Sequence, residues 1–229
     1  MDDERTIAGL AVKVRGDVRA KGLPVVVLLH GFASRASDLA PLFDAFGPSL
    51  RFVFPEAPIA LGDEAAGRAW WNIDVAARDA AMERGEERDL SRQVPIGLSS
   101  ARATLDRLLD EIEATMSPSA LIVGGFSQGA ILACDATLRS SRKLAALVLL
   151  SGARIAEDEW RPRYPSRRGL PVFQSHGRHD AHLSCSVAER LHEELAGAGL
   201  EVTWLPFEGE HEVPLVVLRA LRKFLRRFI

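Results

Sequence analysis

Cysteine, net charge and long apolar runs are all scarce in this chain of 229 residues, and each scarcity excludes something. Two cysteines, Cys134 and Cys185, are too few for a disulfide framework at this length. A net charge of -2 gives no electrostatic reason to expect nucleic acid as a partner. Apolar runs such as Val25 to Leu29 are too short to span a bilayer, so we expect no membrane insertion. Met1 to Arg5 is acidic and does not resemble a secretory signal, which favours a cytoplasmic location.

Short β-rich segments alternate with helical patterns along the whole chain. That order predicts an α/β fold with a mostly parallel sheet and helices on both faces. The length suits one domain, which we place over residues 1–229. The predicted strands are Ala8 to Val14, Val25 to Leu29, Arg51 to Phe54, Ala120 to Gly124, Ala146 to Leu150, Pro171 to Ser175 and Glu201 to Pro206. Apolar stripes at helical spacing begin at Leu98, Leu183 and Leu218, and each predicts a helix packed on the sheet.

One segment does not fit the alternation of strands and helices. Pro58 to Val94 contains Trp70, Trp71 and a charged stretch from Glu83 to Arg92. A long insertion between a strand and a helix is usually a surface excursion that helps to shape a pocket. We therefore expect a lid-like insertion at about residues 58–94.

The segment from Gly125 to Gly129 has the pattern Gly-x-Ser-x-Gly, with Ser127 at its centre. A predicted strand, Leu121 to Val123, runs into it, and a helical pattern from Ala130 leaves it. That context favours a sharp turn that exposes the serine at the carboxyl edge of the sheet. Small residues around the serine let the backbone close on itself. Ser127 is therefore a candidate nucleophile, and a plain helix cap is the weaker interpretation.

A serine hydroxyl needs a base, and the base needs an acid that orients it. In such sheets the acid follows the serine and the histidine comes last, after the final strand. Of six histidines, His211 alone occupies that place, whereas His192 falls inside a helix. The turn after the preceding strand carries one carboxylate, Asp180. Asp180 and His211 are the candidate acid and base, with Asp158 as the reserve acid.

Four residues near Asp180 suggest a competing interpretation. His176, His179, His182 and Cys185 recur every third position, and zinc sites use such ligands. This spacing would place them on one face only if the segment were helical throughout. Gly177 and the preceding strand favour a turn instead, so we predict no metal site.

Attack on an ester carbonyl creates an oxyanion that needs two donors already in place. One is the backbone N–H of the residue after the nucleophile, Gln128. The second usually comes from the loop after an early strand, where Leu29 is followed by His30 and Gly31. Gly31 lets the backbone turn inward, so we expect Phe32 to supply the second N–H.

Together these motifs resemble the phospholipase/carboxylesterase family of small α/β hydrolases, which includes acyl-protein thioesterases. The likeness rests on Leu28 to Gly31, Pro55 to Pro58, Gly124 to Gly129, His176–Gly177 with Asp180, and His211. The resemblance implies a sheet of seven or eight strands and a triad of Ser127, Asp180 and His211. It also implies backbone oxyanion donors at Phe32 and Gln128, and no cofactor.

The resemblance further implies small-molecule ester substrates with short- to medium-chain acyl groups, or thioesters of acylated proteins. Trp70 and Trp71 are similar to an aromatic segment beside the family's acyl pocket, and we assign them to substrate binding. A homodimer is left open. Ala181 to Cys185 departs from the short apolar, proline-containing run that often follows the acid in this family, which puts substrate preference in doubt. A catalytically silent binding module is the alternative from another class, although such proteins typically lack a triad member.

Overall fold

The computed structural model describes residues 3–17, 20–62, 67–86 and 89–229, and an eight-stranded sheet forms its centre. The strands lie in the order β1-β2-β4-β3-β7-β8-β9-β10. From β4 to β10 all neighbours run parallel, and β1 and β2 are antiparallel additions at one edge. The mostly parallel sheet predicted from the sequence is therefore confirmed. The strands are β1 (Asp3–Ile7), β2 (Leu10–Arg15), β3 (Val25–Leu29), β4 (Arg51–Pro55), β7 (Leu121–Phe126), β8 (Ala146–Leu150), β9 (Pro171–Gly177) and β10 (Glu201–Phe207).

The amino-terminal strand differs from the prediction. Instead of one strand from Ala8 to Val14, the chain forms a hairpin in which Ile7 pairs with Leu10. Ala8 and Gly9 form the turn with φ values of 50° and 80°. Two successive positive φ values suit the twist of a tight hairpin, but alanine is not a residue that normally signals such a turn. The sequence pattern therefore did not reveal it.

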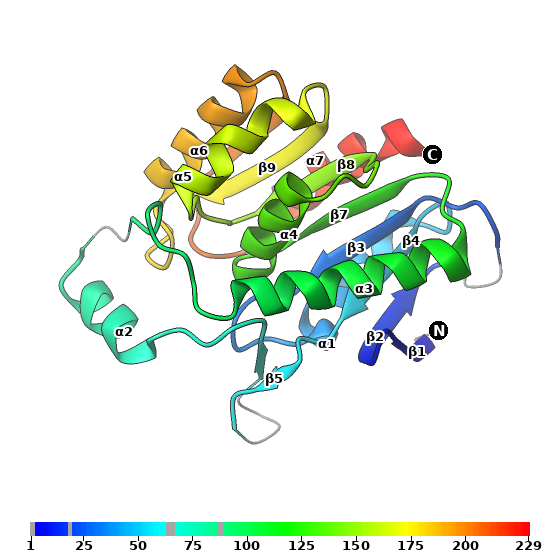
Figure 1. The fold of residues 1–229 in the computed structure, drawn as a ribbon, viewed down its shortest axis with the longest axis horizontal. Helices are drawn as coiled ribbons and strands as arrows, with labels where there is room; N and C mark the ends of the chain where they lie inside the picture. Colours follow the sequence, from blue (N-terminus) through cyan, green and yellow to red (C-terminus); the bar gives the residue numbers. More distant parts are fainter. Residues whose placement is uncertain (1–2, 18–19, 63–66, 87–88) are drawn as a thin grey trace.

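Helices cover both faces of the sheet, as Figure 1 shows. On the nearer face lie α3 (Leu98–Met116), α4 (Gln128–Arg139), α5 (Glu157–Trp160) and α6 (Cys185–Gly197). The other face carries α1 (Ala36–Leu39) and α7 (Leu215–Leu225). Three short 3₁₀ helices, Ala40–Phe46, Arg161–Arg167 and Arg226–Phe228, also belong to the described part of the chain.

The strand β3 explains why both faces must be covered. Its residues alternate between two apolar clusters: Val25, Val27 and Leu29 pack with α3 and α4, and Val26 and Leu28 pack with α7. All five are fully buried. Burial of an aliphatic side chain of this size contributes roughly 1.5–3 kcal/mol. Layers on both sides therefore hold the central strands, and with them the carboxyl edge of the sheet.

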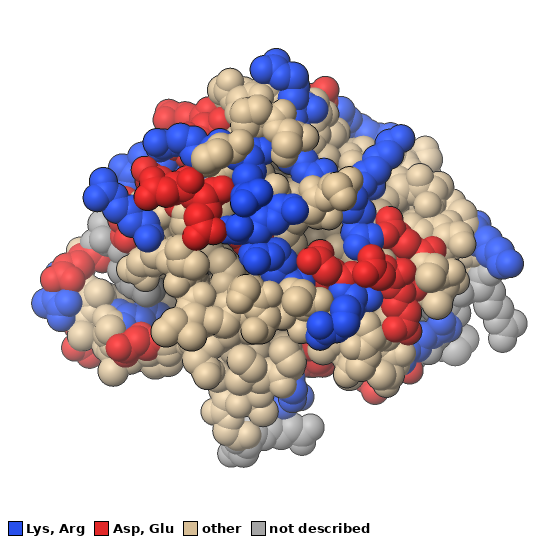
Figure 2. All heavy atoms as spheres, viewed as in Figure 1, with Lys and Arg blue, Asp and Glu red and all other residues tan. Residues whose placement is uncertain are grey.

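Charged side chains of both signs are mixed on the face that Figure 2 shows. Ion pairs join different elements of the chain, for example Arg154, in the loop before α5, with Glu194 of α6 at 2.5 Å. Arg142 pairs with Asp110 at 2.6 Å between the end of α4 and α3. Each of these pairs joins a loop to a helix. In the Arg142–Asp110 pair the Asp110 side chain is exposed, so its contribution to stability is modest.

The insertion predicted at residues 58–94 leaves the sheet and forms small elements of its own. They are β5 (Ile59–Ala60), β6 (Arg68–Ala69) and α2 (Val75–Glu83), which has no buried residue. Figure 1 shows α2 apart from the sheet, at the left edge of the view. Residues 87 and 88, within the charged stretch from Glu83 to Arg92, lie outside the described residues. None of the described helices combines the length and apolar character needed to cross a membrane.

Candidate active site

Ser127 lies in a strained turn between β7 and α4. Its backbone φ of 53° and ψ of -118° fall outside the regions that L-residues favour. Such a conformation costs on the order of 1–3 kcal/mol and persists only where the surroundings hold it. Here the Ser127 N–H donates to the Leu150 carbonyl at 2.9 Å, and its own carbonyl accepts from Ile131 at 3.1 Å. The turn is therefore fixed on both sides of the serine.

The glycines on either side of the serine are required by close backbone packing. A Cβ at Gly129 would lie 2.2 Å from the Leu29 carbonyl oxygen, at the end of β3. A Cβ at Gly125 would lie 2.5 Å from the carbonyl carbon of Gly129. No side chain fits at these distances, so the turn can press against β3 only if both positions are glycine.

Asp180 and His211 form a direct hydrogen bond. His211 Nδ1 lies 2.6 Å from one oxygen of the Asp180 carboxylate, and His176 Nε2 lies 3.2 Å from the same oxygen. The other oxygen accepts from the backbone N–H groups of His182 and Leu183, both at 2.9 Å. The carboxylate is thus supplied with donors on both oxygens.

These donors set the charge of Asp180. Burial by itself would raise the pKa of Asp180, but the hydrogen bonds from His176 and His211 outweigh it and hold that pKa well below its ordinary value. The side chain is fully buried and ionised at neutral pH. Because the ionised Asp180 carboxylate accepts a hydrogen bond from His211 Nδ1, that nitrogen carries a proton. The other ring nitrogen, Nε2, is therefore free to accept a proton from another group.

Gly177, which precedes the acid turn, allows the two loops to meet. A Cβ there would lie 2.0 Å from the Glu210 carbonyl oxygen, next to His211. The N–H of His179 donates to the Gly209 carbonyl at 2.9 Å, which ties the acid loop to the histidine loop. We did not predict this role from the sequence, although the glycine at the end of β9 was its signal.

A cavity of about 810 Å³ opens at the carboxyl edge of the sheet. Five of the seven predicted site residues line it: Ser127, Gln128, Phe32, His211 and Trp71. Asp180 lies behind His211. Much of the remaining lining comes from the insertion and the segment after it, namely Asn72, Ile73, Asp74, Ala77, Arg78, Glu86, Asp89, Leu90, Gln93, Val94, Pro95 and Ile96.

The His211 ring is packed between two other side chains of the site. The Phe126 ring lies 4.7 Å from it and the His182 ring 5.0 Å, measured between ring centroids. His182 also lines the cavity. Neither contact was predicted, because the patterns that contain Phe126 and His182 do not show which rings meet His211.

Trp70 does not line the cavity, which differs from the prediction that it contacts substrate. Only 1% of its surface is exposed, and its indole N–H donates to the His30 carbonyl at 2.9 Å. Trp71, the next residue, lines the cavity, whereas Trp70 faces the protein interior. Trp70 is therefore part of the packing beneath the site.

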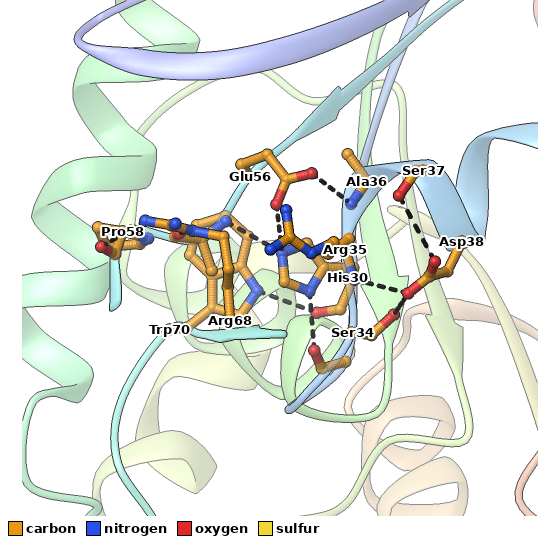
Figure 3. A network of polar contacts seen from close by, with 12 residues as sticks. His30, Ser34, Arg35, Ala36, Ser37, Asp38, Glu56, Pro58, Arg68 and Trp70 are labelled. Carbon is orange, nitrogen blue, oxygen red and sulfur yellow. Dashed lines mark hydrogen bonds and ion pairs between the residues drawn. The ribbon is translucent and has the colours of Figure 1, made fainter. Parts of the chain in front are cut away.

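His30, in the loop expected to supply an oxyanion donor, is held by two backbone groups (Figure 3). The N–H of Ala57 donates to His30 Nε2 at 3.0 Å, so Nδ1 carries the proton and donates to the Gly31 carbonyl at 2.8 Å. Burial lowers the pKa of His30, against opposing effects of the Gly31 carbonyl and Glu56. The ring is therefore neutral at neutral pH and serves as a structural support.

Arg68 fastens the same loop to the insertion (Figure 3). Its guanidinium donates to the carbonyls of Ala57 and Pro58, the latter at 2.8 Å. Its backbone carbonyl accepts from Ala33 at 2.9 Å, directly after Phe32. The start of the insertion and the oxyanion loop thus form one connected structure.

The residues of the competing metal interpretation lie in different environments. His176 is buried against Asp180, whereas His179 is exposed beside Glu208. Among the described residues, no group of three or more His, Cys, Asp and Glu side chains is arranged to hold a metal ion. His192, which was set aside because it falls inside a helix, stacks on Trp204 with ring centroids 5.5 Å apart, and the reserve acid Asp158 is exposed on α5.

Comparisons with known proteins define the class. Residues 15–229 match the family model described as Phospholipase/Carboxylesterase. The chain therefore belongs to the phospholipase/carboxylesterase family, and it has the α/β-hydrolase fold that the sequence predicted.

Two curated relatives named as acyl-protein thioesterases are similar to this chain. It is 30% identical to acyl-protein thioesterase 1 homolog 2 of Dictyostelium discoideum over 156 residues, which cover 66% of this chain and 65% of that protein, just under two thirds. It is 26% identical to acyl-protein thioesterase 1 of Gibberella zeae over 219 residues, covering 88% of this chain and 89% of the relative.

Solved structures show the same likeness in three dimensions. The crystal structure of esterase PE8 superposes with a TM-score of 0.79 at 26% identity, covering 96% of this chain and 99% of that one. The carboxylesterase from Mesorhizobium loti has a TM-score of 0.73 at 17% identity, covering 98% of each chain, and shows the shared fold alone.

Proposed function

We propose that this protein is a serine hydrolase that cleaves carboxylic esters of short- to medium-chain acyl groups through an acyl-enzyme. One observation carries the proposal. Ser127, in a strained turn, and His211, whose ring is bound to the ionised Asp180, line the same cavity. A nucleophile, a base and an orienting acid are the three groups that this reaction needs.

In the proposed reaction, Ser127 Oγ attacks the ester carbonyl carbon while His211 Nε2 takes the hydroxyl proton. The carbonyl oxygen becomes an oxyanion that accepts hydrogen bonds from the backbone N–H groups of Phe32 and Gln128. Collapse of this intermediate breaks the ester bond, and the alcohol leaves with the proton from His211. Asp180 stabilises the imidazolium through its hydrogen bond to Nδ1.

The second half of the reaction repeats these steps with water. His211 removes a proton from water, which attacks the acyl carbon, and the carboxylic acid leaves as the proton returns to Ser127. The scheme uses no cofactor.

A thioesterase acting on acylated proteins is the second candidate, because several relatives carry the name acyl-protein thioesterase. The proposed machinery serves either bond, since both reactions pass through the same acyl-enzyme. Comparing kcat/KM on p-nitrophenyl butyrate with that on an S-palmitoylated peptide separates the two candidates. A preference for the peptide of more than tenfold would favour the thioesterase.

The direct test of the proposal is hydrolysis of p-nitrophenyl butyrate by single variants. Ser127→Ala and His211→Ala should each lower kcat by about 10³-fold or more, because each removes a group that acts in the transition state. His192→Ala is the matched control and should retain wild-type kcat. Full activity in Ser127→Ala, or equal losses in the two histidine variants, would contradict the proposal.

Two further expectations from the sequence stay predictions. One is a cytoplasmic location, and the other is the possibility of a homodimer, which was left open. Sedimentation at micromolar concentration would settle the second.

A further inference from the structure

Gln128 has a buried side chain whose two polar atoms both bind the Trp70–Trp71 segment. Its Oε1 accepts from the Trp70 backbone N–H at 2.9 Å, and its Nε2 donates to the Trp71 carbonyl at 2.8 Å. Only 4% of Gln128 is exposed. A primary amide is the side chain that can accept and donate in this way at once, so the fit between side chain and backbone is specific.

The Trp70–Trp71 segment is also held from two other directions. The indole of Trp70 donates to the His30 carbonyl, in the loop that leads to Phe32. On the opposite side, a Cβ at Gly97 would lie 3.1 Å from the Trp71 Cβ, so the start of α3 packs closely against this residue. The segment therefore bridges the serine turn, the oxyanion loop and α3.

The chain that follows Trp71 adds only apolar support, from Ile73, which packs against the core cluster that contains Trp71. The helix α2 begins only four residues later and has no buried residue. Apolar packing is not directional, so the position of the Trp71 backbone at the cavity wall also depends on polar anchors, of which the Gln128 amide provides two hydrogen bonds.

We infer that the Gln128 side chain is a positioning residue that sets acyl-chain selectivity by holding Trp71 at the cavity wall. This inference rests on the proposed function. The same residue is expected to supply an oxyanion donor, but through its backbone N–H, which every substitution except proline retains. Side-chain variants therefore separate the two roles.

The experiment measures kcat/KM on p-nitrophenyl acetate and p-nitrophenyl octanoate with Gln128→Met. Methionine has a similar length but can neither donate to Trp71 nor accept from Trp70 as an amide does. Only the longer chain extends along the wall, so the octanoate-to-acetate ratio should fall at least fivefold. Any shift of the backbone N–H lowers both rates together and cancels in the ratio.

Gln174→Met is the matched control. Gln174 is also a buried glutamine that donates to a backbone carbonyl, that of Ala188 at 2.7 Å, but it does not line the cavity. Its octanoate-to-acetate ratio should stay within twofold of the wild-type ratio. A wild-type ratio in Gln128→Met, with thermal unfolding showing a folded protein, would overturn the inference.

A second set of variants tests the route through Trp71 and covers the case in which Gln128→Met does not fold. Trp71→Ala should itself lower the ratio, and adding Gln128→Met to it should change the ratio no further. Gln128→Glu, which retains an acceptor for Trp70 but not a donor for Trp71, should also lower the ratio. If the two substitutions in the double variant each lowered the octanoate-to-acetate ratio by their separate factors, the inference would be contradicted. A wild-type ratio in Gln128→Glu would contradict it as well.

Failure of the inference differs from failure of the proposed function. If wild-type protein cleaves both esters and the Gln128 variants keep its chain-length profile, only the inference is wrong. If wild-type protein cleaves neither ester, the proposed function fails and the inference fails with it.

Discussion

The serine turn and the insertion lie on the same cavity but are held in opposite ways. The turn from Gly125 to Gly129 is packed so closely against β3 that a single methyl group would overlap backbone atoms. The helix α2 of the insertion has no buried residue, and its Arg78 pairs with the neighbouring Asp79 at the surface. The first region depends on steric fit, and the second on a few anchors and exposed ion pairs.

This difference separates chemistry from selectivity. A turn that tolerates no displacement keeps Ser127 fixed relative to the proposed oxyanion donors, which the reaction needs for any substrate. Exposed ion pairs contribute only about 0–1 kcal/mol each, so the exposed helix α2 of the insertion can change sequence at little cost in stability. We expect substitutions in the turn to abolish activity or folding, and substitutions in the insertion to alter substrate preference.

The largest effect on activity is expected for Asp180→Asn, because Asp180 lies behind His211 in the catalytic part of the proposed site. An amide cannot stabilise the His211 imidazolium as a carboxylate does, so kcat should fall by about 10³-fold or more. Steady-state kinetics on p-nitrophenyl butyrate measure this. A loss of less than tenfold would mean that Asp180 is not the orienting acid.

The same variant makes a prediction about stability and pH. Because the folded-state pKa of Asp180 is lowered, ionised Asp180 stabilises the fold at pH values above its ordinary pKa. That stabilisation is lost as pH falls from about 4 towards the folded-state pKa. Urea unfolding between pH 7 and pH 3 should therefore show a steeper loss of stability in wild type than in Asp180→Asn. Parallel curves would contradict the lowered pKa.

Gly129→Ala should give the next largest effect, on folding. Its Cβ would meet the Leu29 carbonyl oxygen at 2.2 Å, so the free energy of unfolding should fall by more than about 3 kcal/mol. Gly197→Ala, at the end of α6 where a Cβ meets nothing within 4 Å, is the control and should change it by less than about 0.5 kcal/mol. Equal stability of the two variants in urea unfolding would refute the packing account of the turn.

The sequence predicted the rigid region better than the insertion, for a physical reason. The strand–turn–helix context of Ser127 and the order of Asp180 and His211 are dictated by the sheet, and such constraints leave local patterns. The hairpin at Ala8–Gly9 was missed because alanine does not normally signal such a turn. The inward orientation of Trp70 depends on a partner distant in sequence, the His30 carbonyl, and no local pattern encodes it. Gly177 lies between these two cases. The sequence shows a glycine at this position, but the residue that it packs against, Glu210, is distant in sequence.

Trp70→Phe tests the contact between the insertion and the oxyanion loop, and it should lower the free energy of unfolding by a moderate amount. It removes the donor to the buried His30 carbonyl and leaves unfilled volume, which should cost about 2 kcal/mol. Urea unfolding measures the cost. No change in stability would mean that the indole N–H does not fasten the segment to the oxyanion loop.

Asp89→Asn should have the smallest effect. Asp89 pairs with Arg190 of α6 at 3.3 Å, and both side chains are more than 40% exposed. The free energy of unfolding should change by less than about 0.5 kcal/mol, and less again at high salt. A loss of more than 1 kcal/mol would show that the insertion is held more firmly than its exposure indicates.

Covalent labelling with a fluorophosphonate tests the central claim most directly, because the probe reacts only with a serine that a neighbouring base has activated. Mass spectrometry of the labelled wild-type protein should find a single adduct on the peptide that contains Ser127, and the His211→Ala variant should label at least a hundredfold more slowly. An unlabelled wild-type protein, or an adduct on another serine, would contradict the account and favour a catalytically silent binding module.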